Sequence, residues 1–168
     1  VFYEGDFIRI FRGIDMLINA NIYAPDNSSK YFGMGNDTPK TESSRFYNVR
    51  RDLYEFNAML KKQFNKNNTF SFGPGIAVTD VRKSEGKFYT SAEGGLSPED
   101  FGTFTLPGVV LKYKFNNTNR KINPTKGIKA RFVSKYVHNL TTNQSLLRSN
   151  ASFTFYQKVP GTGIIFAS

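Results

Sequence analysis

The sequence of 168 residues predicts an all-β fold, an antiparallel transmembrane β-barrel with about eight strands in this chain. Long segments alternate apolar and polar residues, and long connections between them alternate with short ones. No apolar run approaches the roughly 18 to 20 residues of a membrane-spanning helix. The mean hydropathy of -0.44 is compatible with a barrel, because membrane strands expose only half of their residues to lipid. We expect residues 1–168 to form a single barrel segment.

The alternation is clearest in residues 127–138. Phe132 and Tyr136 point to one side of a strand, whereas Lys129 and Arg131 point to the other. One face of this strand is therefore apolar and the opposite face is largely cationic. Such a strand fits a wall between lipid and water.

The N-terminal third predicts two strands and a long loop. The segment Phe2 to Phe11 is apolar on both faces, and Arg12-Gly13 forms a short turn after it. Ile14 to Ala24 alternates again and forms the second strand. Asn, Asp, Ser, Pro and Gly are then frequent, which predicts a loop from Pro25 to Ser44.

The middle of the chain leaves one alternative open. Phe46 to Phe64 alternates as a strand, but the apolar residues of Leu53 to Phe64 also fit the spacing of a helix. Asn65 to Asn68 predicts a tight turn, and Phe70 to Val78 a further strand. Gly73-Pro74-Gly75 inside that strand predicts an irregular pairing or a bulge.

The remaining segments follow the same rules. They predict the loop Arg82 to Phe104, the strand Pro107 to Asn116, the turn Asn117 to Pro124, the strand Gly127 to His138, the connection Asn139 to Asn143, the strand Ser145 to Gln157, the turn Pro160-Gly161 and a short strand Ile164 to Phe166. Every second connection is short, as in membrane barrels, although Asn139 to Asn143 is shorter than this rule suggests.

The alternation assigns side chains to two faces of the barrel wall. The residues predicted to face lipid are Ile18, Phe56, Leu60, Phe72, Leu111, Phe132, Phe153 and Phe155. The basic residues predicted to face the interior are Lys61, Lys112, Lys114, Lys129, Arg131, Lys135 and Arg148. A hydrated wall is the ordinary role for these cations, and binding of anions or of a loop inserted into the lumen is the alternative.

Composition excludes several classes of function. The net charge of +10 does not predict nucleic-acid binding, because Lys and Arg are spread over strands and turns instead of one helix or tail. One histidine, His138, and no cysteine leave no set of ligands for a metal. Glu93, Glu99 and Asp100 lie in a loop where solvation is their usual role. We expect no enzymatic activity and no cofactor.

Two short motifs resemble a known family. The residues Tyr31, Phe32, Gly33, Met34, Gly35, Asn36, Asp37 and Thr38 precede an aromatic and basic run, Phe46 to Arg50. This arrangement is similar to a loop and strand of BamA/TamA-like outer-membrane proteins, the bacterial surface-antigen barrels that include versions with a metallophosphoesterase domain. Asn123 to Ile128 is similar to the N-P-x-x-G element that begins a strand there. Gly33 and Gly35 also have a simple structural role, since glycine allows positive φ angles in tight loops.

The resemblance implies a barrel of sixteen strands in the bacterial outer membrane, of which this chain is an interior block. It implies insertion or translocation of other proteins, with outer-membrane lipids, lipopolysaccharide, client barrel proteins and other outer-membrane subunits as partners. The chain does not contain the family's Val-Arg-Gly-Phe/Tyr motif or its periplasmic repeat domains, and both ends suggest a piece of a longer protein.

Two alternatives remain open. Eight strands can close around a side-chain-filled interior, which would give a complete small barrel with a structural, adhesive or pore function. A soluble ligand-binding barrel of the lipocalin type would instead need its apolar face to point inward.

Overall fold

The chain folds as one antiparallel sheet of eight strands in sequence order, which confirms the all-β prediction. The computed structural model describes residues 1–33, 42–91, 94, 96–159 and 163–167. The strands are β1 (Phe2–Phe11), β2 (Ile14–Lys30), β3 (Asn48–Gln63), β4 (Asn68–Arg82), β5 (Gly102–Thr118), β6 (Gly127–Asn139), β7 (Gln144–Val159) and β8 (Gly163–Ala167). Two short 3₁₀ helices, η1 (Phe88–Thr90) and η2 (Pro98–Asp100), lie between β4 and β5. Within these described segments, no helix has the length and apolarity needed to cross a membrane.

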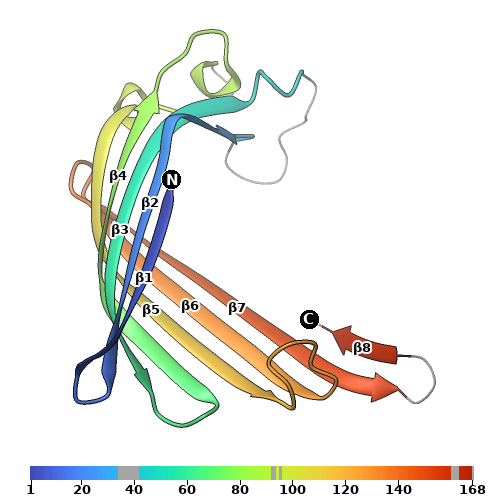
Figure 1. Cartoon of the computed structure of the whole chain (residues 1–168). Coiled ribbons are helices and arrows are strands. Elements are labelled where there is room, and N and C mark those ends of the chain that lie inside the picture. Colours follow the sequence, from blue (N-terminus) through green and yellow to red (C-terminus); the bar gives the residue numbers. More distant parts are fainter. Residues whose placement is uncertain (34–41, 92–93, 95, 160–162, 168) are drawn as a thin grey trace.

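The sheet is strongly curved but open (Figure 1). In the described part of the chain, β1 pairs only with β2 and β8 pairs only with β7. The two outer strands therefore do not close the sheet, and the alternative of a complete eight-stranded barrel does not form in this structure.

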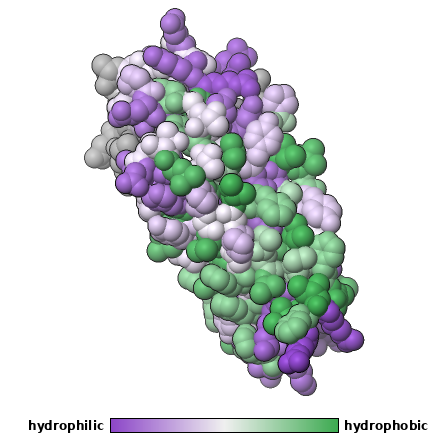
Figure 2. All heavy atoms as spheres, turned by 90° about the vertical axis from the view of Figure 1, so that its left-hand side faces the viewer, coloured by the Kyte–Doolittle hydropathy of each residue, from purple (hydrophilic) through white to green (hydrophobic). Residues whose placement is uncertain are grey.

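The two faces of the curved sheet differ in character. The pairing places Phe132 opposite Tyr113 and Ala151, so these residues share the convex face. Figure 2 shows an apolar band on this face between hydrophilic ends. Arg131, by contrast, lies opposite Lys114 on the concave face. A polar concave face is the reverse of what a lipocalin-type barrel requires.

Strand β2 is longer than the sequence predicted, so the expected loop from Pro25 to Ser44 is wrong at its beginning. Residues 27–30 of β2 pair with residues 48–51 of β3. The register shifts between Tyr23 and Asn27, where four steps along β2 face two along β3. The side chains of this part of β2 are polar and typical of a loop, so the sequence alone predicted a loop. The backbone of these residues nevertheless pairs with β3.

Other boundaries differ for the same reason. Strand β5 already begins at Gly102, inside the loop predicted over Arg82 to Phe104.

The helical alternative over Leu53 to Phe64 is wrong, because β3 pairs continuously with β2 along residues 53–61. Pairing to neighbouring strands thus overrides the local helical spacing.

The connections are arranged as an up-and-down meander (Figure 1). The β1–β2, β3–β4 and β5–β6 connections lie at the lower end, and the β2–β3, β4–β5 and β6–β7 connections lie at the upper end. The β5–β6 connection is ordered by Asn119, whose Oδ1 accepts hydrogen bonds from the backbone N–H groups of Thr125 and Lys126 at 3.1 Å. The predicted turn Pro160-Gly161 lies outside the described residues.

The irregular pairing predicted at Gly73-Pro74-Gly75 is an interruption and not a bulge. Pro74 pairs with Val109 of β5 in an unbroken register. The register with β3 is the same on both sides of the interruption, which spans Ala58 and Met59. A Cβ atom added to Gly73 would lie 2.0 Å from the carbonyl oxygen of Ala58 and 2.6 Å from the Cα of Met59. Glycine therefore allows β3 and β4 to approach closely at this point.

We predict that Gly73→Ala destabilises the protein by at least about 2 kcal/mol, because the methyl group meets backbone that cannot move without disturbing two strands. The control is Gly5→Ala, where the nearest atoms are ends of the Tyr3 and Phe7 side chains on an edge strand. Urea unfolding in lipid vesicles, followed by circular dichroism, measures both changes. Equal effects of the two substitutions would contradict the proposed close approach.

Candidate functional site

The candidate site is the concave face of the sheet, which carries most of the charged side chains of the strands. Its acidic residues lie on the first three strands, and they are Glu4, Asp6, Asp15 and Glu55. Its basic residues include Lys61 on β3 and a larger group on β5, β6 and β7, namely Lys112, Lys114, Lys129, Arg131, Lys135 and Arg148. The face is therefore divided by charge along the direction that crosses the strands.

The sequence contains this division once the registers are known. Residues 101–168 hold ten of the 23 Lys and Arg residues and none of the 13 Asp and Glu residues. Residues 1–100 are consequently neutral, and the whole net charge of +10 lies in the second part of the chain. The cations alone are spread over strands and turns and do not reveal the division. The signal that could have revealed it is the absence of acidic residues after Asp100.

In the acidic half, Lys61 joins the first three strands. Its ammonium group forms ion pairs with Asp6 of β1 and, at 3.3 Å, with Asp15 of β2. Asn19 of β2 also donates a hydrogen bond to Glu4 at 2.9 Å. Lys61 thus compensates part of the negative charge of this half, which remains acidic.

Two long side chains of the basic half cross the concave face to reach the acidic half. The ammonium group of Lys135 on β6 lies 2.5 Å from a carboxylate oxygen of Glu55 on β3. The ammonium group of Lys112 on β5 donates to Asn19 Oδ1 on β2 at 3.2 Å. Lys135 reaches over β4 and β5, and Lys112 reaches over β3 and β4, so both contacts pass over β4.

Strand β4 leaves room for these contacts because its concave face carries only small residues over this stretch. These residues are Ser71, Gly73, Gly75 and Ala77. The side chain of Asn57 occupies the space above Gly75, where an added Cβ would lie 2.2 Å from its Oδ1. A larger residue on this face of β4 would displace Asn57 or the lysines.

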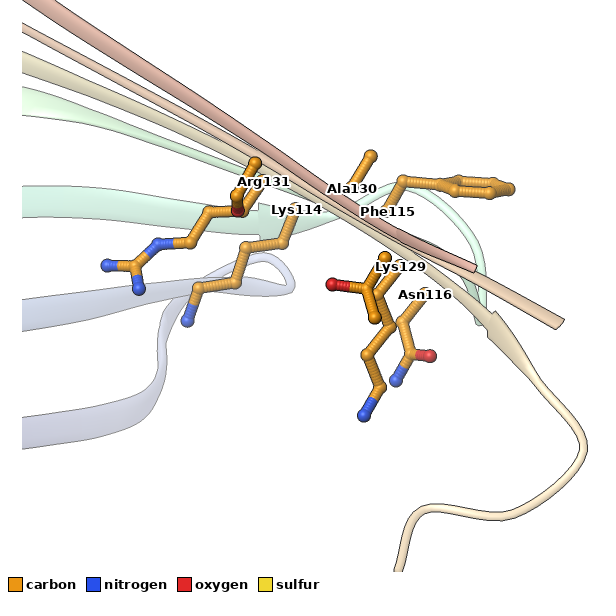
Figure 3. Close-up of a pocket in the computed structure, with 8 residues that line it drawn as sticks. Lys114, Phe115, Asn116, Lys129, Ala130 and Arg131 are labelled. Atoms are coloured by element: carbon orange, nitrogen blue, oxygen red, sulfur yellow. The ribbon is translucent and has the colours of Figure 1, made fainter. Parts of the chain in front are cut away.

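The remaining cations form a basic strip, which we define as Lys114, Lys129, Arg131 and Arg148. Figure 3 shows Lys114, Lys129 and Arg131 with Asn116 on one side of the strands, and Phe115 and Ala130 on the other. No carboxylate of the described residues lies within ion-pair distance of the basic strip. Lys129 instead places its ammonium group 5.1 Å from the centre of the Tyr156 ring.

An aromatic cluster lies at the upper end of the concave face, formed by Tyr31, Phe32, Phe46, Tyr47 and Phe88. The Tyr47 ring is at its centre, 4.9 Å from the ring of Phe32 and 5.2 Å from that of Phe88. Tyr47 and Phe88 are the best-buried members, with 1% and 3% of their surface exposed. The Tyr31 hydroxyl donates to the Gly94 carbonyl at 3.1 Å, which ties the end of β2 to the β4–β5 connection.

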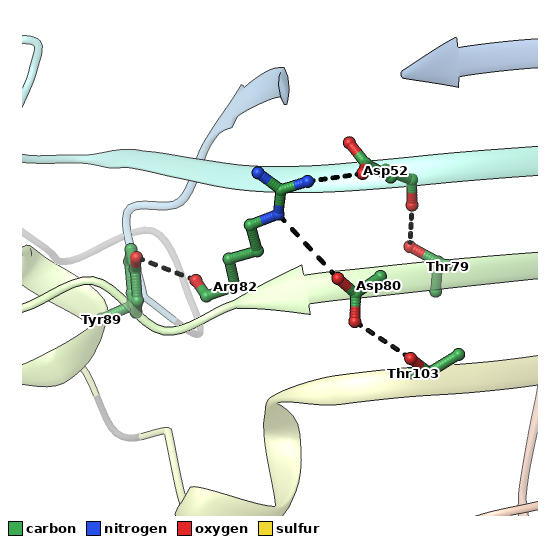
Figure 4. A network of polar contacts seen from close by, with 6 residues as sticks. All are labelled: Asp52, Thr79, Asp80, Arg82, Tyr89 and Thr103. Carbon is green, nitrogen blue, oxygen red and sulfur yellow. Dashed lines mark hydrogen bonds and ion pairs between the residues drawn. The ribbon is translucent and has the colours of Figure 1, made fainter. Parts of the chain in front are cut away.

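A polar network on the upper ends of β3, β4 and β5 supports the same connection (Figure 4). Arg82 lies 2.7 Å from Asp52 and 3.9 Å from Asp80. Thr103 donates to Asp80 at 3.0 Å, and the Tyr89 hydroxyl donates to the Arg82 carbonyl at 3.2 Å. These contacts hold neighbouring strands together and fix Tyr89, so their role is structural.

The predicted loop motif is only partly described. Tyr31 and Phe32 belong to the aromatic cluster, and Gly33, which follows them, has a φ of 93°, as expected for a glycine that permits a tight loop. Met34, Gly35, Asn36 and Thr38 lie outside the described residues. The second motif is a turn in which Asn123 and Gly127 have φ values of 51° and 123°.

The structure places all of the predicted basic residues on the concave face, but it joins only Lys61, Lys112 and Lys135 to partners in the acidic half. The residues predicted to face lipid all lie on the convex face, and they are Ile18, Phe56, Leu60, Phe72, Leu111, Phe132, Phe153 and Phe155. The acidic partners of these lysines were not predicted, although the same alternation places Asp15 and Glu55 on the concave face.

The described residues contain no group of three or more His, Cys, Asp and Glu side chains that could hold a metal ion. His138 shares a hydrogen bond of 3.0 Å with Ser145 on the neighbouring strand. Asp100 accepts a hydrogen bond from the Ser97 backbone at 2.8 Å and so stabilises η2. Both residues have local partners that explain their positions.

Comparison with known proteins adds one finding. The sequence model of the Omp85 superfamily domain matches residues 16–168, which is most of the chain. No curated protein and no solved structure matches this chain.

The contact between Glu55 and Lys135 allows a test of the concave face by a double-mutant cycle. We predict that Glu55→Gln and Lys135→Gln are coupled by about 1 kcal/mol in the free energy of unfolding, because the two charges meet across β4 and β5. The control cycle combines Glu55→Gln with Lys114→Gln, whose expected coupling is close to zero. Urea unfolding in lipid vesicles measures both cycles, and equal coupling in the two would show that the side chains of Glu55 and Lys135 do not meet.

Proposed function

This chain belongs to the Omp85 superfamily, and we propose that it forms part of the barrel wall of a BamA/TamA-like protein that inserts or translocates proteins at the bacterial outer membrane. The superfamily match supports the broader class of outer-membrane insertion and translocation proteins. The observation that carries the proposal is the curved, open sheet, which is apolar outside and charged inside.

The convex face would contact lipid. Its apolar band consists of exposed large side chains that include Phe56, Leu60, Phe72 and Phe153. Exposed apolar surface of this extent is unfavourable in water and favourable in a bilayer. Outer-membrane lipids and lipopolysaccharide are therefore the proposed partners of this face.

The concave face would line the barrel interior. Its charges and amides would be costly in lipid but can be hydrated in a lumen. Backbone groups of β1 and β8 lack a neighbour on one side in the described part of the chain, and a membrane wall requires such groups to be paired, so the proposal includes further strands beside them. A barrel of sixteen strands, with residues 1–168 as one continuous segment of its wall, meets this requirement.

The proposed function is not enzymatic. Members of the superfamily are generally not enzymes and interact with client proteins and outer-membrane components. Client barrel proteins and other outer-membrane subunits are accordingly the proposed protein partners, and the proposal needs no cofactor.

A folding assay tests the function. The protein is reconstituted in vesicles of outer-membrane lipid, and an unfolded barrel client is added. We expect the client to fold faster than in protein-free vesicles, measured by the mobility shift of folded barrels in unheated gels. Vesicles that contain an unrelated outer-membrane barrel provide the control. If the two barrels accelerated client folding equally, the proposed function would be wrong.

A substitution tests the orientation of the wall. We predict that Phe132→Arg, in the middle of β6 on the convex face, costs roughly 2 to 4 kcal/mol of folding free energy in lipid, since a cation would face the hydrocarbon. Lys129→Gln on the concave face should cost less than about 1 kcal/mol, the typical value of an exposed cation–π contact. Folding titrations in lipid vesicles measure both, and the reverse ranking would exchange the inner and outer faces.

A further inference from the structure

We propose that the basic strip on the concave face of β5, β6 and β7 binds an extended acidic segment of polypeptide. The carboxylates of that segment would pair with Lys114, Lys129, Arg131 and Arg148. This inference rests on the proposed function, because it takes the concave side as the interior of the barrel that a passing chain can enter.

The basic strip carries positive charge that no acidic residue of residues 101–168 compensates. Lys114 lies directly opposite Arg131 in the pairing of β5 with β6, and Lys135 lies directly opposite Arg148 in the pairing of β6 with β7. Like charges directly opposite each other destabilise a sheet. Glu55 compensates Lys135, but residues 101–168 contain no acidic side chain that could compensate the others. An external anion would remove this repulsion.

The surface around the basic strip is hollowed. A hollow of about 280 Å³ has Lys114, Asn116, Lys129, Arg131, Ser152 and Thr154 among its lining residues. A second hollow of about 470 Å³ has Arg131, Val133, Arg148, Asn150 and Ser152 among its lining residues. Because Arg131 and Ser152 line both hollows, the two are adjacent on β6 and β7.

The spacing of the cations favours an extended peptide over a single small anion. Lys129 and Arg131 are two residues apart on β6, which corresponds to about 7 Å along the strand. Alternate side chains of an extended peptide have the same spacing, so carboxylates on every second residue could reach successive cations. Neutral donors lie beside the cations and can bind the peptide backbone: Asn116 and Thr154 are opposite Lys129, and Ser152 is opposite Arg131.

The orientation of the side chains is consistent with such a ligand. Lys114, Lys129 and Arg131 extend away from the sheet on the concave side (Figure 3). Arg131 and Arg148 are exposed, so neither has to leave a packed position to bind. The acidic half of the concave face would repel the same peptide, which confines it to β5, β6 and β7.

The experiment uses the reconstituted protein in nanodiscs of neutral lipid and a fluorescent peptide of alternating Glu and Thr. Fluorescence anisotropy measures its Kd. We expect the double variant Lys114→Gln/Arg131→Gln to weaken binding roughly five- to tenfold, because two exposed charge pairs are lost. The charge-preserving variant Lys114→Arg/Arg131→Lys should bind nearly as well as the unmodified protein.

The matched control is Arg120→Gln/Lys121→Gln in the β5–β6 connection, which removes the same charge from exposed residues outside the strands and outside the two hollows. We expect its Kd to change less than twofold. Equal weakening by both double variants would show only a general attraction to positive charge and would overturn the proposal. It would also fail if inorganic phosphate or a lipid diphosphate bound the strip while the peptide did not.

Two further outcomes separate this inference from the proposed function. If the protein accelerates client folding but does not bind the peptide, the basic strip is not a peptide site and the proposed function stands. If Lys114→Gln/Arg131→Gln fails to give the folded band in unheated gels and the unmodified protein does not bind the peptide, the cations serve an internal contact. That result would also overturn the proposal.

Discussion

The strict alternation of side chains between two unlike environments is the constraint on which this structure depends. A shift of one residue in any strand pairing would move Lys129 and Arg131 to the apolar face and Phe132 to the charged face. The one large irregularity in β2 respects this rule. Four steps along β2 face two along β3 between Tyr23 and Asn27, so the surplus is an even number of residues and the faces stay in phase. The register of each strand pair is therefore specified by the free-energy cost of moving apolar side chains to the charged face and charged side chains to the apolar face. The turns only have to be compatible with that register.

Curvature of the sheet is the second constraint. Together with the small residues of β4, it allows side chains of distant strands to meet on the concave face. With Ser71, Gly73, Gly75 and Ala77 on the concave face of β4, the strands on either side can be linked by lysine side chains that span it. Glycine weakens a strand intrinsically, and Pro74 removes a backbone donor next to it. The ion pair of Lys135 with Glu55 and the hydrogen bond of Lys112 to Asn19 offset part of this local cost.

The sequence predicted the features that follow from period and composition, and it missed those that follow from pairing. Most strands and the assignment of Phe132 and Lys129 to opposite faces required only the alternation. The upper part of β2 was read as a loop, because Asn27, Ser28 and Ser29 have loop composition while their backbone pairs with β3. The contact of Lys135 with Glu55 joins residues eighty positions apart, and only the register and curvature of four strands bring them together. The aromatic cluster likewise needs Phe88 from a separate connection to bury Tyr47.

The uneven distribution of charge distinguishes the two halves of the concave face physically. In the first three strands, Lys61 lies among carboxylates, and its ion pairs with Asp6 and Asp15 add cohesion. In β5, β6 and β7, repulsion between opposed cations lowers stability, and no acidic residue of residues 101–168 reduces it. A hydrated wall alone would be served equally well by Ser, Thr and Asn, which already occupy β7. Cations held in opposed pairs beside neutral hydrogen-bonding residues suit the proposed acidic ligand, whose carboxylates would reduce the repulsion between them.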